Sequence, residues 1–129
     1  MIKIFLVGDQ PSIGKGLQMQ MALESDFTVI GGTGDCLSAS RLIRELKPDV
    51  VVLDLDMPDR DGFTALHAIH SQGIDIPVII LSFQADPVSR QRALASGATD
   101  FIEKHSGGTE LFAAIRRLAG GPKPSVSMG

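Results

Sequence analysis

The stretch that most constrains the fold runs from Asp49 to Gly62 and reads DVVVLDLDMPDRDG. Its first half is apolar and rich in β-branched residues, which is typical of a short strand buried on both faces of a parallel sheet. Such a strand carries Asp54 to the edge of the sheet at which it ends. Pro58 prevents further pairing because it has no backbone N–H, and Asp61-Gly62 predicts a turn that leads into a helix.

Apolar runs and amphipathic stretches alternate along the rest of the chain. Strands are predicted at residues 2–7, 27–30, 49–54, 76–81 and 99–103, and helices near residues 11–21, 35–46, 62–71, 86–96 and 111–118. Five strands that alternate with five helices predict an α/β fold, with a parallel sheet covered by helices on both faces. Right-handed crossovers then favour a doubly wound (βα)5 arrangement with the strand order 2-1-3-4-5.

The chain has the size of one ordinary domain, with 129 residues of which 43% are hydrophobic. We assign residues 1–119 to this domain. Residues 120–129 are predicted to form a linker-like tail, because they begin with Gly-Gly-Pro-Lys-Pro-Ser.

Composition argues against several classes of protein. No apolar run approaches the roughly 20 residues of a membrane span. The net charge is −3 and no basic patch is present, so direct binding of nucleic acid by this chain is not expected. A single cysteine, Cys36, allows no internal disulfide and fits a cytoplasmic protein. His67, His70 and His105 have no neighbouring pattern of ligands that suits zinc.

Four polar residues are predicted to follow four of the strands at one edge of the sheet: Asp9, Asp54, Ser82 and Lys104. Ligands of doubly wound sheets bind at this edge, where the first and third strands would place Asp9 beside Asp54. A divalent cation relieves the repulsion between two carboxylates, and Mg²⁺ suits such a site.

This set of side chains predicts a phosphoryl acceptor. The Asp54 carboxylate would attack a phosphoryl donor and form an acyl phosphate. Mg²⁺ and the Lys104 ammonium would neutralise charge during transfer, and Ser82 would bond a phosphoryl oxygen afterwards. A nucleotide-binding P-loop is not expected, because five residues separate Gly8 from Gly14 and Lys15 is followed by glycine.

Three segments carry a resemblance to a known family, namely residues 54–62, 78–82 and 97–104. In order and spacing they resemble the receiver domains of bacterial response regulators, and the resemblance extends over residues 2 to about 119. Around Leu46-Lys47-Pro48-Asp49 the chain looks most similar to receivers of the LuxR, NarL and FixJ type, which are joined to helix-turn-helix DNA-binding domains.

The resemblance implies a role for each site residue. Asp54 would be phosphorylated, Asp9 would bind Mg²⁺ directly and the backbone carbonyl of Asp56 would be a further ligand. Lys104 would pair with the phosphoryl group, while Ser82 and Phe101 would be the switch residues.

It also implies a signalling role rather than an enzyme. A sensor histidine kinase would phosphorylate Asp54. The altered surface would then favour a homodimer or act on an output module, expected to be a DNA-binding domain outside this chain that controls transcription.

Two residues depart from the pattern of the family. Gly8 stands where receivers usually have the first of two acids, and Phe83 follows Ser82 where a small residue is usual. Both leave open a degenerate receiver that acts as an interaction module without control by phosphorylation. A third alternative, a flavodoxin-like cofactor carrier, is disfavoured because the chain has no Trp or Tyr to stack on a flavin.

Overall fold

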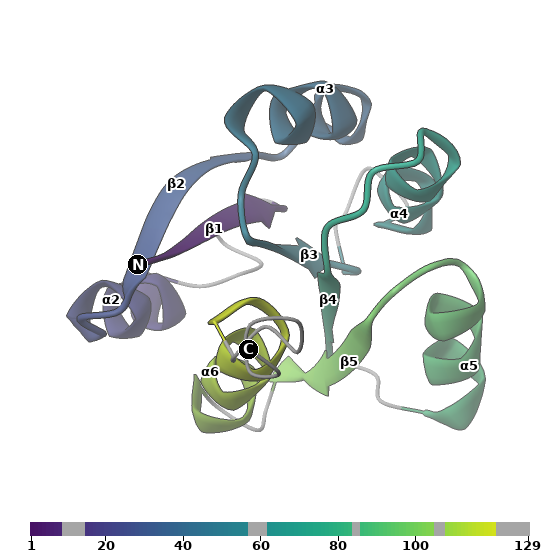
Figure 1. Cartoon of the computed structure of the whole chain (residues 1–129). Coiled ribbons are helices and arrows are strands. Elements are labelled where there is room, and N and C mark those ends of the chain that lie inside the picture. The colour runs from purple at the N-terminus through teal and green to yellow at the C-terminus, as the bar shows by residue number, and fades with distance from the viewer. Residues whose placement is uncertain (9–14, 57–61, 84–85, 105–107, 121–129) are drawn as a thin grey trace, which may run out of the picture.

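The computed structural model describes residues 1–8, 15–56, 62–83, 86–104 and 108–120. Strands and helices alternate along the chain, as the sequence predicts (Figure 1). In chain order the elements are β1 (Ile2–Val7), α2 (Lys15–Leu23), β2 (Phe27–Thr33), α3 (Cys36–Leu46), β3 (Val50–Asp54), α4 (Gly62–Ser71), β4 (Val78–Ser82), α5 (Pro87–Ala95), β5 (Asp100–Glu103) and α6 (Gly108–Ile115), which continues as the π-helical turn η2 (Arg116–Gly120).

The five strands form one parallel sheet in the order β2-β1-β3-β4-β5, so the predicted fold class and strand order are confirmed. The order reverses between β1 and β3, which lie side by side with Val7 opposite Leu53. On the other side of β3, Asp54 pairs with Leu81 of β4. The exits of β1, β3 and β4 therefore meet at one edge of the sheet.

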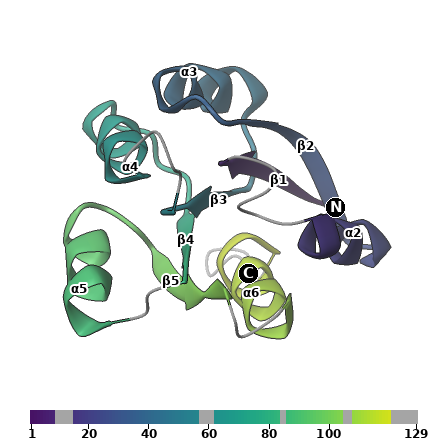
Figure 2. The same ribbon diagram turned by 180° about the vertical axis from the view of Figure 1, so that it is seen from behind.

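Helices cover both faces of this sheet. In both views α3, α4 and α5 lie on one face, and α2 and α6 lie on the other (Figures 1 and 2). Alternate residues of β3 divide between two cores, because Val51 and Leu53 pack toward the first face while Val50 and Val52 pack toward the second. All five residues of β3 are buried, which confirms that this strand is covered on both sides.

The largest boundary error concerns β2. The strand was expected to end at Ile30, but it continues through Gly31, Gly32 and Thr33, which pair with the second half of β1. A register shift between Ile4 and Phe5 accommodates the longer pairing. A Cβ on Gly32 would lie 2.9 Å from the carbonyl oxygen of Leu6, so the glycine allows the close approach that the pairing needs.

Other boundaries differ by a few residues. The fourth strand begins at Val78 and not at Ile76, and the last helix begins at Gly108, before the expected start at Leu111. The start of the first helix, expected near Pro11, lies outside the described residues. Asp86, the first residue of the predicted helix over 86–96, is the N-cap of α5, because its side chain accepts the backbone N–H of Ser89 at 3.1 Å.

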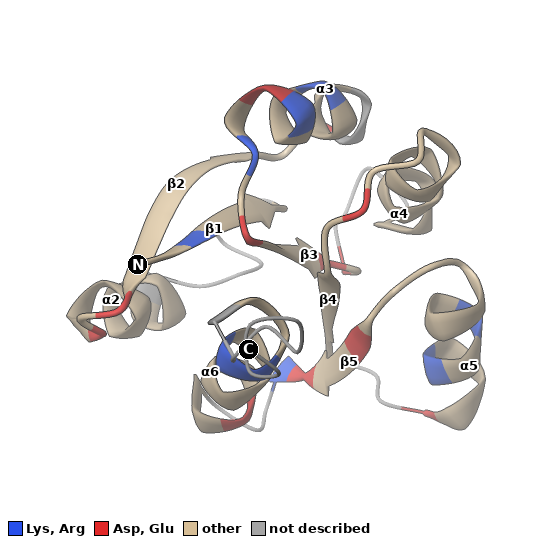
Figure 3. Ribbon diagram, viewed as in Figure 1, with Lys and Arg blue, Asp and Glu red and all other residues tan. Residues whose placement is uncertain are grey.

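None of the helices that the structure describes is both long and apolar enough to span a lipid bilayer. Lys and Arg residues are spread over β1, α3, α5, the residue after β5 and η2, with acidic residues between them (Figure 3). Most of the expected tail, residues 121–129, lies outside the described part of the chain.

Candidate functional site

Asp54 occupies the centre of the site at the exit of β3, and its side chain is fully buried. Its Oδ1 accepts the backbone N–H of Asp56 at 2.8 Å, which turns the chain back toward the carboxylate. The next residue, Leu55, donates its N–H to the carbonyl of Leu81, so the chain stays against β4 just beyond the strand. Both bonds fix the direction in which the carboxylate points.

Gly62 brings the start of α4 against this turn. A Cβ at this position would lie 2.8 Å from the Cα of Leu55 and 3.0 Å from the carbonyl oxygen of Asp54. Only a residue without a side chain fits such an approach. The glycine predicted as the turn into the third helix therefore also fixes the position of that helix beside the site.

Lys104 reaches Asp54 from the end of β5, two strands away. Its Nζ lies 2.7 Å from Asp54 Oδ1 and 3.3 Å from Asp56 Oδ2. Both separations are those of ion pairs, although the Nζ does not have the alignment of a regular hydrogen bond. The Lys104 side chain is only 7% exposed, so one buried ammonium faces two carboxylates. The predicted proximity of Lys104 and Asp54 is found.

Ser82, the last residue of β4, is also buried at this edge. Its hydroxyl donates to Asp56 Oδ1 at 3.2 Å, and the following backbone N–H, of Phe83, donates to Asp56 Oδ2 at 2.7 Å. Ser82 thus belongs to the same cluster as Asp54 and Lys104, as predicted. It is bonded there to Asp56.

The contacts of the Asp56 carboxylate with Ser82 and Lys104 were not predicted. The sequence analysis gave this residue a role at the site through its backbone carbonyl. A signal was available in the spacing, because an Asp side chain often accepts the backbone N–H two residues on and so forms a turn that brings that residue beside it. Asp54 and Asp56 have this spacing, and both reach Lys104.

Phe83 and Phe101 have different surroundings. The Phe83 ring is half exposed, and its centroid lies 4.4 Å from Lys104 Nζ, a cation–π distance. The Phe101 ring is buried within the core beneath α3, α4 and α5, while its backbone carbonyl accepts Arg90 Nη1 at 3.3 Å. Phe83 therefore borders the polar cluster, and Phe101 packs in the apolar core.

Gly8, at the exit of β1, has a backbone φ of +148°, a conformation that residues with side chains rarely adopt. A Cβ built on it would lie 2.6 Å from the Cβ of Asp54. The β1 backbone thus passes directly against the central carboxylate. The departure from the family at this position comes with a local backbone that has no room for the acid that receivers usually carry there.

One buried carboxylate oxygen at the site, Asp54 Oδ2, suits a magnesium ion as a ligand. Asp54 Oδ2 is buried, and no hydrogen-bond donor of the described residues meets it. A buried carboxylate oxygen of this kind is the hard ligand that Mg²⁺ prefers. Asp9, the other predicted side-chain ligand, lies outside the described residues, and among those described no three His, Cys, Asp or Glu side chains surround a common point.

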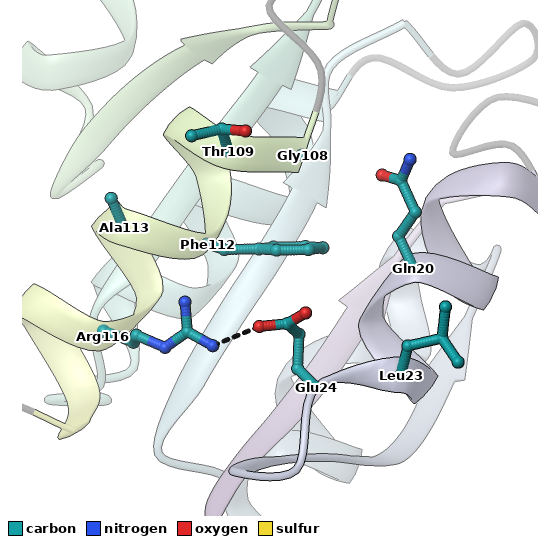
Figure 4. A pocket seen from close by; sticks show the side chains of 8 residues that line it. All are labelled: Gln20, Leu23, Glu24, Gly108, Thr109, Phe112, Ala113 and Arg116. Carbon is teal, nitrogen blue, oxygen red and sulfur yellow. Dashed lines mark hydrogen bonds and ion pairs between the residues drawn. The ribbon is translucent and has the colours of Figure 1, made fainter.

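A separate hollow of about 490 Å³ opens between α2 and α6 (Figure 4). Its lining comes from Gln20, Leu23, Glu24, Gly108, Thr109, Phe112, Ala113 and Arg116. The Arg116 guanidinium pairs with Glu24 at its rim and with Asp26 at 2.9 Å. The hydrogen bond from Arg116 lowers the pKa of the Asp26 carboxyl, and both acids raise the pKa of Arg116. None of the lining residues belongs to the cluster around Asp54.

A doubly wound sheet of order 2-1-3-4-5, with a buried acid at its switch point and a lysine beside it, defines a receiver-like class of protein. The sequence profile of the response regulator receiver domain matches residues 4–116. The chain belongs to this family.

Known relatives agree with this assignment. The uncharacterized transcriptional regulatory protein YhcZ of Bacillus subtilis is 34% identical over 93% of this chain and 56% of its own length. The signal receiver domain of the response regulator NarL from Mycobacterium tuberculosis has a TM-score of 0.82 and 30% identity, covering 94% of this chain and 98% of that one. A LuxR-family response regulator from Aurantimonas has a TM-score of 0.83 and 27% identity, covering 99% of this chain and 94% of that one. The predicted likeness to receivers of the NarL and LuxR type is confirmed, and the chain spans just over half of the length of YhcZ.

Proposed function

We propose that this receiver domain is phosphorylated on Asp54, with Mg²⁺, by a sensor histidine kinase in the cytoplasm. The observation that carries the proposal is the fully buried Asp54 carboxylate with Lys104 Nζ at 2.7 Å. A buried carboxylate kept beside a buried ammonium at the ligand-binding edge of a doubly wound sheet is suited to nucleophilic attack on a charged donor. Membership of the receiver family supports the same reaction.

In the transfer step, an Asp54 oxygen forms a bond to phosphorus while the bond between phosphorus and the kinase histidine nitrogen breaks. The imidazole leaves with the electron pair and takes up a proton from solvent. Lys104 neutralises part of the charge that the phosphoryl oxygens bring, and the N–H of Asp56 keeps the carboxylate oriented. When bound, Mg²⁺ would supply further charge neutralisation, with Asp9, Asp54 and the backbone carbonyl of Asp56 as its proposed ligands.

Ser82, which lies at the end of β4 within the same cluster, would transmit phosphorylation of Asp54 to the surface of the domain. Its hydroxyl would move to a phosphoryl oxygen and draw the segment after β4 with it, and Phe101 would adjust its ring next to that segment. The changed surface would favour a homodimer or act on a DNA-binding output domain in the rest of a longer transcriptional regulator. Apart from its own phosphorylation and dephosphorylation, the domain would catalyse no reaction.

A second candidate function is an interaction module that phosphorylation does not control. The observations that favour it are the conformation of Gly8, which leaves no room for the usual acid, and the Phe83 ring beside Lys104. Both would weaken the binding of Mg²⁺ or the access of a donor.

The intact mass of the protein after incubation with acetyl phosphate and Mg²⁺ tests the two candidates. We expect the wild type to gain one phosphoryl group and Asp54→Asn to gain none. Asp75→Asn, which removes an exposed acid elsewhere, is the matched control and should behave as the wild type. A folded wild type that gains nothing over a range of millimolar Mg²⁺ concentrations would favour the interaction module.

A further inference from the structure

The Asp56 carboxylate is held by three donors that come from two strand ends. Ser82 Oγ donates to Oδ1 at 3.2 Å, the N–H of Phe83 donates to Oδ2 at 2.7 Å, and Lys104 Nζ lies 3.3 Å from the same Oδ2. The Asp56 side chain is 27% exposed, so the group is partly open to water. We call this arrangement of Asp56 and its three donors the Asp56 latch.

The three donors form a set that recognises an anion with several oxygens. A hydroxyl, a backbone N–H and an ammonium together offer hydrogen bonds from different directions, and each gains strength from a charged acceptor. An ionised carboxylate has only two oxygens, and in the latch both are engaged. The donors are therefore already occupied by an anion that the chain itself supplies.

Asp56 and Asp54 also compete for the same cation. Lys104 Nζ lies within 3.3 Å of both carboxylates, so its single positive charge is shared between two negative ones. The acyl phosphate would carry about −1.5 to −2 in place of the single negative charge of the Asp54 carboxylate, so phosphorylation would add roughly half to one negative charge next to Asp56. The negative charges of the phosphoryl group and of the Asp56 carboxylate would repel each other. The phosphoryl oxygens would also need the donors that Asp56 holds.

We propose that the Asp56 carboxylate acts as an internal substitute for the phosphoryl group. It holds Ser82, Phe83 and Lys104 in the unphosphorylated protein, and phosphorylation switches the domain by displacing it from these donors. The inference rests on the proposed function, since it requires a phosphoryl group on Asp54 that competes with the Asp56 carboxylate for the same donors. Asp56 thereby sets the affinity of the site for a phosphoryl group and is a regulatory rather than a catalytic residue.

A purely structural role for Asp56 predicts the opposite effect of its removal. If the latch only fixes the segment after β4, then Asp56→Ala would leave Ser82 and Phe83 poorly oriented, and a phosphoryl mimic would bind more weakly. If the latch competes, then Asp56→Ala would free the donors, and the mimic would bind more tightly. The sign of the change in affinity therefore separates the two roles.

The probe is beryllofluoride, a phosphoryl mimic that can be titrated by calorimetry at saturating Mg²⁺ and followed by ¹⁹F NMR. We expect Asp56→Ala to bind it about tenfold more tightly than the wild type. The wild type must break a charge-assisted hydrogen bond to the Asp56 carboxylate when the mimic binds, whereas the variant has no such bond to break, and one bond of this kind corresponds to roughly this factor. Asp56→Asn should show a smaller gain, because its amide oxygen still accepts from Ser82 or Phe83 without attracting Lys104. Asp75→Ala is the control for a general change in net charge.

Two further measurements make the result specific to the latch. The tighter binding of beryllofluoride by Asp56→Ala should persist at 0.5 M salt. The Debye length is then roughly 4 Å, so a general effect of net charge would be screened. In ¹⁵N spectra of the protein without beryllofluoride, the amide signal of Phe83 should move upfield in Asp56→Ala and stay in place in Asp75→Ala, because only the first variant loses its acceptor. This second readout needs no bound ligand.

The outcomes distinguish failure of this inference from failure of the proposed function. Wild type that binds beryllofluoride, together with a folded Asp56→Ala that binds it equally or more weakly, would overturn the latch and leave phosphorylation of Asp54 intact. Absence of binding to every variant, together with absence of phosphorylation by acetyl phosphate, would overturn both. Tighter binding by Asp56→Ala with an unchanged Phe83 amide signal would also contradict the latch, since the freed donor would not be the one described.

Discussion

Replacement of Gly8 by alanine should destabilise the fold through two independent effects. The backbone φ of +148° is unfavourable for any residue with a Cβ, and the new Cβ would lie 2.6 Å from the Cβ of Asp54. Asp54 is fully buried and bonded to Asp56, so it cannot simply turn aside. The N–H of Gly8 is also bonded to the carbonyl of Thr33 at 2.8 Å, which keeps the β1 backbone in place.

The expected loss is about 2–4 kcal/mol of unfolding free energy. A strained backbone conformation costs of order 1–3 kcal/mol, and overpacking by one methyl group costs a further 1–3 kcal/mol or so. The smaller conformational entropy of the unfolded alanine chain returns roughly 0.4–1 kcal/mol. For a domain of this size the loss corresponds to a fall in Tm of roughly 7–15 °C.

Urea denaturation followed by far-UV circular dichroism measures this loss, because the chain has no Trp or Tyr for fluorescence. Gly16→Ala is the matched control, since nothing lies within 4 Å of a Cβ at this position in α2. It should leave stability unchanged or raise it by up to about 1 kcal/mol, as alanine favours the helix. A Gly8→Ala protein within 0.5 kcal/mol or so of wild type would refute the reasoning. The same strain means that Gly8→Asp would not simply restore the acid that receivers usually carry.

Three other changes have outcomes that the structure fixes in direction. Phe83→Ala, which removes the ring next to Lys104, should raise the rate of phosphorylation by acetyl phosphate, measured by intact mass over time. Lys104→Met should lower the unfolding free energy by about 3 kcal/mol because it leaves a buried carboxylate unpaired, and the added change Asp54→Asn should recover most of this loss in urea titrations. Arg116→Gln should make the free energy of unfolding fall less steeply as the pH is lowered into the acid range. The pairing lowers the pKa of Asp26 below its ordinary 3.8, so the stability that it adds is full above this value and is lost as the pH falls through the lowered pKa.

Each of these changes has a control and a contrary result. Val88→Ala removes another exposed apolar side chain and should leave the phosphorylation rate unchanged. An equal rate for Phe83→Ala and wild type would show that the ring does not limit access. A single and a double variant of equal stability would contradict the pairing of Lys104 with Asp54. An unaltered pH profile in Arg116→Gln, against Arg41→Gln as the exposed control, would contradict the assignment of the Asp26 pKa.

The sequence predicted the sheet well because β3 has only one compatible environment. A run of valine and leucine without helical periodicity must be buried on both faces, and the acid that follows must then lie at an edge. The same reasoning placed Ser82 and Lys104 near Asp54, since parallel strands end together. These predictions depended on topology and did not require side-chain detail.

Sequence reasoning failed where close approach of two segments decided the structure. The extension of β2 depends on Gly32 lying against the carbonyl of Leu6, and glycine-rich segments usually suggest a turn. The latch depends on which of several neighbouring carboxylates meets the N–H of Phe83, which the order of residues does not specify. The conformation of Gly8 likewise follows from its contact with Asp54 across two strands.

The half-exposed Phe83 ring also gives the domain a natural position for an optical reporter. A Phe83→Trp variant would contain the only indole of the chain, with its face toward Lys104 Nζ, where the phenyl centroid now lies 4.4 Å away. Indole binds a cation more strongly than phenyl does, and its emission responds to nearby charge. Events at Asp54, which has no Trp or Tyr near it because the chain contains neither, would then be visible as a change in fluorescence from one residue.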